Sequence, residues 1–215
     1  MFRILVASAK GGVGKTTIST TLAGHFALKG KRTVLLDADP QASARIWCGK
    51  REAAGAAPVL ALDGTRRQWR QQIPDKAQRV VIDAPAGAMP DDLEKHLEFA
   101  DALLVPVLPS VLDMEATVRF LNPLAEVPRV ARGELPVGLI ANRLKPWTHA
   151  SQQVTEQLSQ WPVELVAQLR DTQAYVLLAS LGKCIYDYNS GNVRDHQGDW
   201  EPLLRWLKQV RRNGR

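Results

Sequence analysis

The sequence predicts an α/β protein in which helices flank a doubly wound, mainly parallel β-sheet, within a single domain spanning residues 1–215. Two observations lead to this expectation. Short apolar runs alternate along the chain with segments of helical periodicity, which is the order that right-handed βαβ crossovers produce. Within each run the apolar character is continuous and does not alternate with polar residues, as expected for strands that are buried on both faces.

The predicted strands are rich in aliphatic and β-branched residues and cover residues 3–8, 33–39, 79–85, 102–108, 137–142 and 163–169. The predicted helices cover residues 16–29, 91–100, 113–124, 150–160 and 173–181. Residues 50–78 indicate helix fragments and loops, to which we assign no chemistry. Because ligands of such sheets bind outside the carboxyl ends of the strands, we expect the functional residues to gather at that edge.

Residues 199–215 predict a final helix with one apolar face, formed by Trp200, Leu203, Leu204, Leu207 and Val210. Such a face usually packs a terminal helix onto its own domain. The other side of this segment is basic, which matters for the choice of partner below.

Composition narrows the classes of function. No apolar run has transmembrane length and no signal-peptide pattern is present, so we expect a cytoplasmic protein without stable membrane insertion. Two cysteines, Cys48 and Cys184, lie far apart without a nearby histidine, which argues against a metal or iron–sulfur site built on cysteine. The net charge of +6 and the pI near 9.5 favour an anionic partner such as nucleic acid or a membrane surface.

The stretch ASAKGGVGKTTIST, residues 7–20, lies between the first predicted strand and the first predicted helix, as a phosphate-binding loop requires. Its glycines let backbone N–H groups approach an anion, and the helix N-terminus adds a partial positive charge. We expect Lys15 to reach the β- and γ-phosphates, the Thr16 hydroxyl to bind Mg²⁺ and Thr17 to contact the α-phosphate. The loop departs from the common pattern in having Ala9 at its first glycine position, followed by a second lysine, Lys10.

Three aspartates lie at the ends of predicted strands. Asp83 ends a buried strand and fits the carboxylate that holds Mg²⁺ in phosphate-loop ATPases. Asp37 and Asp39 both lie at the carboxyl end of the predicted strand 33–39. We expect Asp39 to orient the attacking water and to contribute to the metal site. Asp37 would support the metal site indirectly or cap a turn.

Three motifs together resemble the ParA/MinD family of ATPases with a deviant phosphate loop: KGGVGKTT at 10–17, DADPQ at 37–41 and VVIDAPAG at 80–87. Segments 106–116 and 169–188 resemble the same family, and the short chain is similar to its small ParF-type partition ATPases. The resemblance implies Mg²⁺-dependent ATP hydrolysis by a homodimer that forms on ATP binding. We expect its intrinsic turnover to be slow, because no strong general base beyond Asp39 is evident in the sequence. In that dimer Lys10 would reach the phosphates bound by the other subunit.

The site residues that the loop and the resemblance imply form overlapping sets. The catalytic set is Lys10, Lys15 and Asp39, and the metal set is Thr16, Asp39 and Asp83. The ATP-binding set is Lys10, Gly11, Gly12, Val13, Gly14, Lys15, Thr16, Thr17, Asn142 and Arg143. Asn142 and Arg143 resemble the strand end that reads the adenine amino group, although no acidic residue follows them. Pro109 and Asp113 would line the base or the dimer interface.

The family resemblance also implies a partner and a location. A partition ATPase would bind nonspecific double-stranded DNA, associate with the nucleoid and position a plasmid, chromosome or protein cargo. A ParB-like activator or cargo adaptor would stimulate hydrolysis. Arg170 and Arg194 resemble family positions that contact the DNA backbone, and the basic end of the chain adds Arg205, Lys208, Arg211, Arg212 and Arg215. Such contacts are salt-dependent and do not read sequence.

Two alternatives remain open at this point. A MinD-type positioning ATPase would instead place the amphipathic C-terminal helix, with Trp200 and Trp206, on an anionic membrane. A metabolic or metallocluster relative would require a cysteine pair or an appended substrate domain, and neither is evident in the sequence.

Overall fold

The computed structural model describes residues 1–214. Within them the chain forms a seven-stranded sheet in the order β3-β2-β4-β1-β5-β6-β7, and every pair of neighbours is parallel. The strands are β1 (Phe2–Val6), β2 (Thr33–Asp37), β3 (Val59–Asp63), β4 (Arg79–Asp83), β5 (Ala102–Val107), β6 (Val137–Leu144) and β7 (Glu164–Arg170). This arrangement confirms the predicted fold class.

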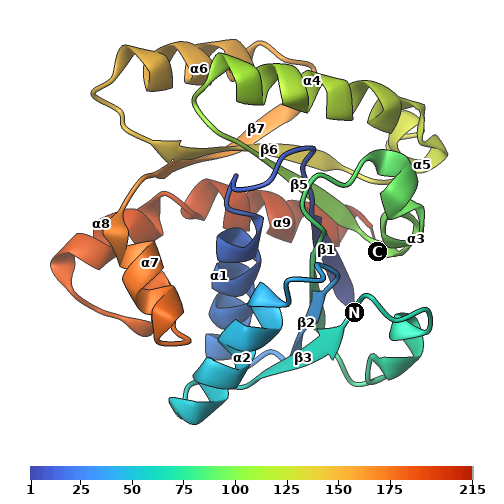
Figure 1. Ribbon diagram of the computed structural model, residues 1–215, viewed down its shortest axis with the longest axis vertical. Helices are drawn as coiled ribbons and strands as arrows, with labels where there is room; N and C mark the ends of the chain where they lie inside the picture. Colours follow the sequence, from blue (N-terminus) through green and yellow to red (C-terminus); the bar gives the residue numbers. More distant parts are fainter. Residues whose placement is uncertain (215) are drawn as a thin grey trace.

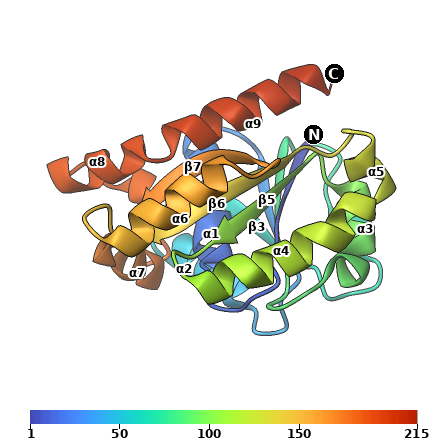
Figure 2. The ribbon, with the colours of Figure 1, turned by 90° about the horizontal axis from the view of Figure 1, so that it is seen from above.

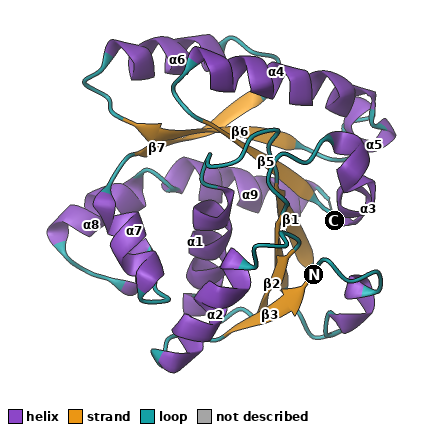
Figure 3. Ribbon diagram, viewed as in Figure 1, coloured by secondary structure: helices purple, strands orange, loops and turns teal. Residues whose placement is uncertain are grey.

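Helices cover both faces of the twisted sheet (Figures 1 and 2). One face carries α1 (Lys15–Leu28), α2 (Ser43–Ala53), α7 (Gln173–Ser180), α8 (Gly191–Gly198) and α9 (Glu201–Asn213). The other carries α3 (Glu94–Phe99), α4 (Val111–Glu126), α5 (Pro128–Ala131) and α6 (His149–Ser159). Short 3-10 turns occur at Trp69–Gln72, Pro90–Leu93 and Ile185–Asp187. Figure 3 shows the sheet between the two helical layers.

The strands are buried on both faces, which is why their sequences are continuously apolar. On the face of α1 and α9 the core includes Ile4, Leu35 and Trp200, none of them with measurable exposure. On the opposite face Leu5 and Phe120 are equally buried. Burial of such side chains contributes roughly 1.5–3 kcal/mol each and supplies the main driving force for this three-layer packing.

The region 50–78 differs from the prediction, because it contains a strand of the sheet. β3 pairs with β2 along its whole length, from Thr33 opposite Val59 to Asp37 opposite Asp63. As the edge strand it is only partly buried, so it lacks the continuous apolar run by which the inner strands were recognised. The expectation of irregular structure was therefore wrong for Val59–Asp63.

The sheet register places the acidic strand ends at one level. Asp83 lies opposite Val6 of β1 and opposite Asp37 of β2. β1 occupies the position between β4 and β5, from which the chain winds outward to both edges. The loop that follows β1 therefore lies at the topological switch point, where open α/β sheets bind their ligands.

Candidate nucleotide-binding site

Residues 7–14 connect β1 to α1 at the carboxyl edge of the sheet, visible in Figure 1 as the blue loop above α1. Gly12 and Gly14 have φ values of 77° and 95°, in the left-handed region that favours glycine. A Cβ atom on Gly14 would also lie 2.4 Å from Nδ2 of Asn142. Both backbone conformation and space therefore require glycine at position 14, the residue that caps the N-terminus of α1.

Lys15 is buried at the first position of α1, with 6% of its surface exposed. Its Nζ atom donates two long hydrogen bonds of 3.4 Å, to the Ser8 hydroxyl and to the Lys10 carbonyl oxygen. Burial lowers the pKa of Lys15, while the charges of Asp83 and Asp39 oppose this effect. A buried ammonium with weak partners is suited to bind an anion at the helix N-terminus.

Asp83 lies beneath the loop, joined to the first turns of α1. Its two carboxylate oxygens accept hydrogen bonds from the hydroxyls of Thr16 at 2.7 Å and Ser19 at 3.0 Å. Burial raises the pKa of Asp83 to about 7, although both hydroxyls act in the opposite direction. Sequence reasoning missed Ser19. Its spacing of three residues from Thr16, which places both on one face of the helix, was the available signal.

A hydroxyl and a carboxylate are oxygen ligands of the kind that Mg²⁺ prefers, so Thr16 and Asp83 fit the expected metal. Within residues 1–214 no group of three or more His, Cys, Asp or Glu side chains is arranged to hold a metal ion. A divalent cation here would therefore depend on additional oxygens, which water and phosphate groups supply at such sites.

Asp37 and Asp39 have different roles in the turn after β2. The Asp37 carboxylate is fully buried and accepts from the backbone N–H groups of Asp39 and Arg45 at 3.1 and 2.9 Å. It therefore caps the turn that leads into α2. Asp39 is partly exposed and accepts from the N–H groups of Gln41 at 2.9 Å and Ala86 at 3.0 Å. Its second hydrogen bond joins this turn to the loop after β4, next to the phosphate loop.

The Lys10 ammonium forms an ion pair of 3.0 Å with the carboxylate of Asp113 at the start of α4. The Lys10 side chain is 44% exposed, whereas that of Asp113 is 7% exposed. Sequence reasoning placed both residues near the site but gave no indication that they pair, because 103 positions separate them.

Asn142 and Arg143 lie at the carboxyl end of β6. The Asn142 side chain is buried and donates from Nδ2 to the Val13 carbonyl oxygen at 2.7 Å, which fixes the position of the phosphate loop. Arg143 is exposed and has a positive φ of 53°, beside an irregularity in the pairing of β6 with β7. Asn142 thus contacts the loop, and the contact of Asn142 and Arg143 with adenine stays a prediction.

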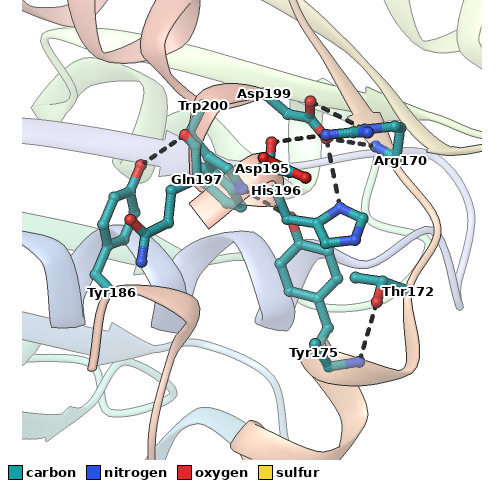
Figure 4. Close-up of polar contacts among 10 residues, drawn as sticks. Arg170, Thr172, Tyr175, Tyr186, Asp195, His196, Gln197, Asp199 and Trp200 are labelled. Atoms are coloured by element: carbon teal, nitrogen blue, oxygen red, sulfur yellow. Dashed lines mark hydrogen bonds and ion pairs between the residues drawn. The ribbon is translucent and has the colours of Figure 1, made fainter. Parts of the chain in front are cut away.

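The residues expected to contact DNA fall into paired and exposed groups. Arg170, at the end of β7, donates from Nε to the Asp199 carboxylate at 2.9 Å and from Nη2 to the Asp195 carbonyl oxygen at 2.6 Å (Figure 4). The exposed group consists of Arg194 on α8 and Arg205, Lys208 and Arg212 on α9. Arg211 is half-buried, and Arg215 lies outside the described residues.

The apolar face of α9 packs against the sheet. Leu203, Trp206 and Leu207 are buried, and Trp206 donates to the Glu164 carboxylate of β7 at 2.9 Å. The face that the MinD-type alternative assigned to a membrane is thus covered by the protein's own core. No helix within residues 1–214 has the length and apolarity to cross a bilayer.

Known proteins resemble this chain over most of its length. The model of the CobQ/CobB/MinD/ParA nucleotide binding domain matches residues 4–183. Maintenance of carboxysome distribution protein A of Halothiobacillus neapolitanus is 35% identical over 164 residues, which cover 73% of this chain and 74% of that protein. The chromosome-partitioning ATPase Soj of Thermus thermophilus is 30% identical over 187 residues, covering 73% and 75%.

Among solved structures, a Borrelia burgdorferi protein described as a plasmid partition protein and bound to AMPPNP superposes with a TM-score of 0.73. It covers 95% of this chain and 98% of its own, and at 18% identity it shows the fold alone. The extent of the family match and the identity to curated relatives lead to the conclusion that this chain is a member of the CobQ/CobB/MinD/ParA nucleotide-binding family.

Proposed function

We propose that this protein is a ParA-like, Mg²⁺-dependent ATPase that forms an ATP-sandwich dimer, binds nonspecific DNA and positions a plasmid, chromosome or protein cargo. A ParB-like partner would stimulate its hydrolysis. The observation that carries the proposal is the buried, weakly partnered Lys15 beside the Thr16–Asp83 pair, at the N-terminus of α1. This arrangement supplies a cation, a hydroxyl and a carboxylate where a triphosphate would lie.

Each side chain then has a defined task in hydrolysis. The loop N–H groups and Lys15 would bind the phosphate oxygens and neutralise charge in the transition state. Bound Mg²⁺ would supply Lewis-acid charge stabilisation, with Thr16 and Asp83 as the residues that hold it. Asp39 would orient the attacking water. Its hydrogen bond to the N–H of Ala86 keeps the carboxylate next to the phosphate loop.

The proposed DNA surface consists of the exposed basic residues on α8 and α9. Arg205, Lys208 and Arg212 follow one another at intervals of three and four residues, so they share the outer face of α9. The paired Arg170 would position this surface. The names of the relatives, which concern carboxysome distribution, chromosome partitioning and plasmid partition, support a role in moving large cargo. The burial of the apolar face of α9 favours DNA over a membrane as the supporting surface.

Cosedimentation with Mg²⁺-ATP tests the surface. Plasmid DNA should carry the protein down, and vesicles of anionic phospholipid should not. Pelleting with vesicles alone would overturn the DNA proposal in favour of the MinD-type alternative.

Two substitutions test the mechanism. Lys10→Ala should abolish ATP-dependent dimerisation measured by light scattering, and intact dimerisation would refute the sandwich role. Asp39→Ala should retain ATP binding but lose phosphate release. Unchanged turnover would remove Asp39 from catalysis.

A further inference from the structure

The Lys10–Asp113 ion pair joins the phosphate loop to the first turn of α4. The Lys10 ammonium lies 3.0 Å from Oδ2 of Asp113, and this same oxygen accepts a hydrogen bond from the Ser110 hydroxyl. Ser110 in turn caps α4 by accepting from the backbone N–H of Asp113 at 3.2 Å. The carboxylate is therefore held rigidly, while the lysine side chain is half-exposed and able to leave.

Asp113 has an incomplete set of partners apart from Lys10. Its Oδ1 atom is buried and has no hydrogen-bond partner among residues 1–214. Within residues 1–214, the ion-pair partner of Asp113 is Lys10. If Lys10 moved away, a carboxylate that is 7% exposed would lose its neutralising charge. Leaving a buried charge without compensation is unfavourable, so the pair resists opening.

We propose that Asp113 is an internal latch for Lys10: it holds the Lys10 ammonium within the free subunit, and the opening of this contact sets the threshold for ATP-dependent dimerisation. The inference rests on the proposed function, in which Lys10 reaches phosphates bound by a second copy. One ammonium cannot remain at 3.0 Å from its own Asp113 and also extend into the other subunit. Each dimer therefore requires two latches to open.

The surface around the latch fits a second copy of this chain. Val111 and Leu112, in the same first turn of α4 as Asp113, are 70% and 67% exposed. The Lys10–Asp113 pair places this turn beside the phosphate loop, where the shared nucleotides would bind. Their burial by the second copy would contribute free energy that offsets the opening of the latches.

The Asp113→Asn variant tests the latch directly. Asparagine keeps an oxygen that can accept from Ser110 but removes the charge that attracts Lys10. An ion pair with one half-exposed partner contributes about fivefold to an equilibrium. Because two latches open per dimer, the dissociation constant should fall by about 25-fold. Glu115→Gln is the matched control, because Glu115 lies on the same helix in an exposed pair with Arg119. It should leave dimerisation unchanged.

Light scattering over a protein dilution series, with a non-hydrolysable ATP analogue and Mg²⁺, measures the dissociation constant of the dimer. An Asp113→Asn dissociation constant equal to that of the wild type, or higher, overturns the latch. Absence of a wild-type dimer would instead refute the proposed function. A second measurement separates the two, because it needs no dimer.

Amine labelling of the nucleotide-free monomer, read by mass spectrometry, reports the latch itself. Relative to the exposed Lys50, Lys10 should be labelled several-fold faster in Asp113→Asn than in the wild type. If the variant does not fold, raising salt from 0.05 to 1 M should accelerate labelling of wild-type Lys10 more than that of Lys50, because screening weakens the pair. Equal responses of the two lysines overturn the latch.

Discussion

Arg51 and Lys15 are both buried cations near aspartates, but their hydrogen-bond partners differ greatly. Arg51 of α2 is 1% exposed and donates to two backbone carbonyl oxygens, at 2.7 and 3.2 Å, and to both oxygens of Asp187, at 2.8 and 3.0 Å. Lys15 donates only at 3.4 Å, to the Ser8 hydroxyl and the Lys10 carbonyl. A cation with complete partners holds the fold together, whereas one with weak partners is available to a ligand.

The neighbouring aspartates repeat this contrast. Although burial acts to raise it, the pKa of Asp187 is held below its usual value by the hydrogen bonds from Arg51. Burial raises the pKa of Asp83 to about 7, and only neutral hydroxyls donate to it. The Arg51–Asp187 pair thus provides its own compensation. In contrast, Lys15 and Asp83 in the phosphate-loop region have only uncharged hydrogen-bond partners within residues 1–214.

The largest expected effect comes from substituting the two cations by methionine. Arg51→Met leaves Asp187 buried without its partner and should lower the free energy of unfolding by about 3–5 kcal/mol. Lys15→Met should change it by less than about 1 kcal/mol, because the weak hydrogen bonds lost are offset by removal of a buried charge. Urea denaturation of the nucleotide-free proteins measures both values. A decrease in the free energy of unfolding of more than about 1 kcal/mol for Lys15→Met would contradict the comparison.

The second largest effect is the pH dependence of folding stability that Asp83 causes. The Asp83 carboxyl group binds its proton more tightly in the folded state, with a pKa of about 7, than in the unfolded state, with a pKa near 3.8. The contribution of Asp83 to the free energy of unfolding therefore falls as pH rises from about 4 through about 7. Asp83→Asn removes that dependence. Without metal, the variant should therefore be more stable than the wild type at pH 8, by roughly 2 kcal/mol, and the gap should close towards pH 4.

Thermal unfolding in EDTA at constant ionic strength measures the Asp83 effect, with Asp37→Asn as the buried carboxylate for comparison. Burial raises the pKa of Asp37 as well, but the backbone N–H groups of Asp39 and Arg45 donate to its carboxylate, so Asp37→Asn should destabilise the turn before α2. A stability gap for Asp83→Asn that does not depend on pH would show that its carboxyl group titrates normally.

The smallest expected effects lie on the basic surface. Arg194→Gln and Arg170→Gln each remove one positive charge. Substituting the exposed Arg194 should reduce the slope of log affinity for DNA against log salt by about 0.9.

Substituting Arg170 should reduce this slope less, but should lower the free energy of unfolding by about 1 kcal/mol, because Asp199 loses its partner. DNA titrations at several salt concentrations, with urea denaturation, distinguish the two. Equal slopes would indicate that pairing does not determine which arginine meets DNA.

Features that depend on short stretches of sequence were predictable. The glycines, Lys15 and Thr16 are contiguous in the sequence, and Asp83 ends a strand with a clear apolar run. The register of parallel strands then brings these residues to one edge without further information. The inner strands of the sheet were recognisable for the same reason, since burial on both faces leaves a continuous apolar signature.

Features that depend on distant side chains were not predictable. β3 is half-buried at the edge, so its five residues carry little signal. The pairs Lys10–Asp113 and Arg170–Asp199 join residues 103 and 29 positions apart, and no local pattern encodes such contacts. The burial of Lys15 and Asp83, on which the proposed chemistry depends, likewise follows from packing around α1 and not from their spacing.

The most direct test of the central claim, that weakly partnered charges at the loop await a nucleotide, is the thermal shift caused by Mg²⁺-ATP in the wild type and in Lys15→Met. At a ligand concentration 100 times the dissociation constant, the wild type should gain about 2.7 kcal/mol and unfold several degrees higher. Lys15→Met should unfold near the wild-type temperature without nucleotide and show no shift with it. Equal stabilisation of both proteins by Mg²⁺-ATP would contradict this account of the site.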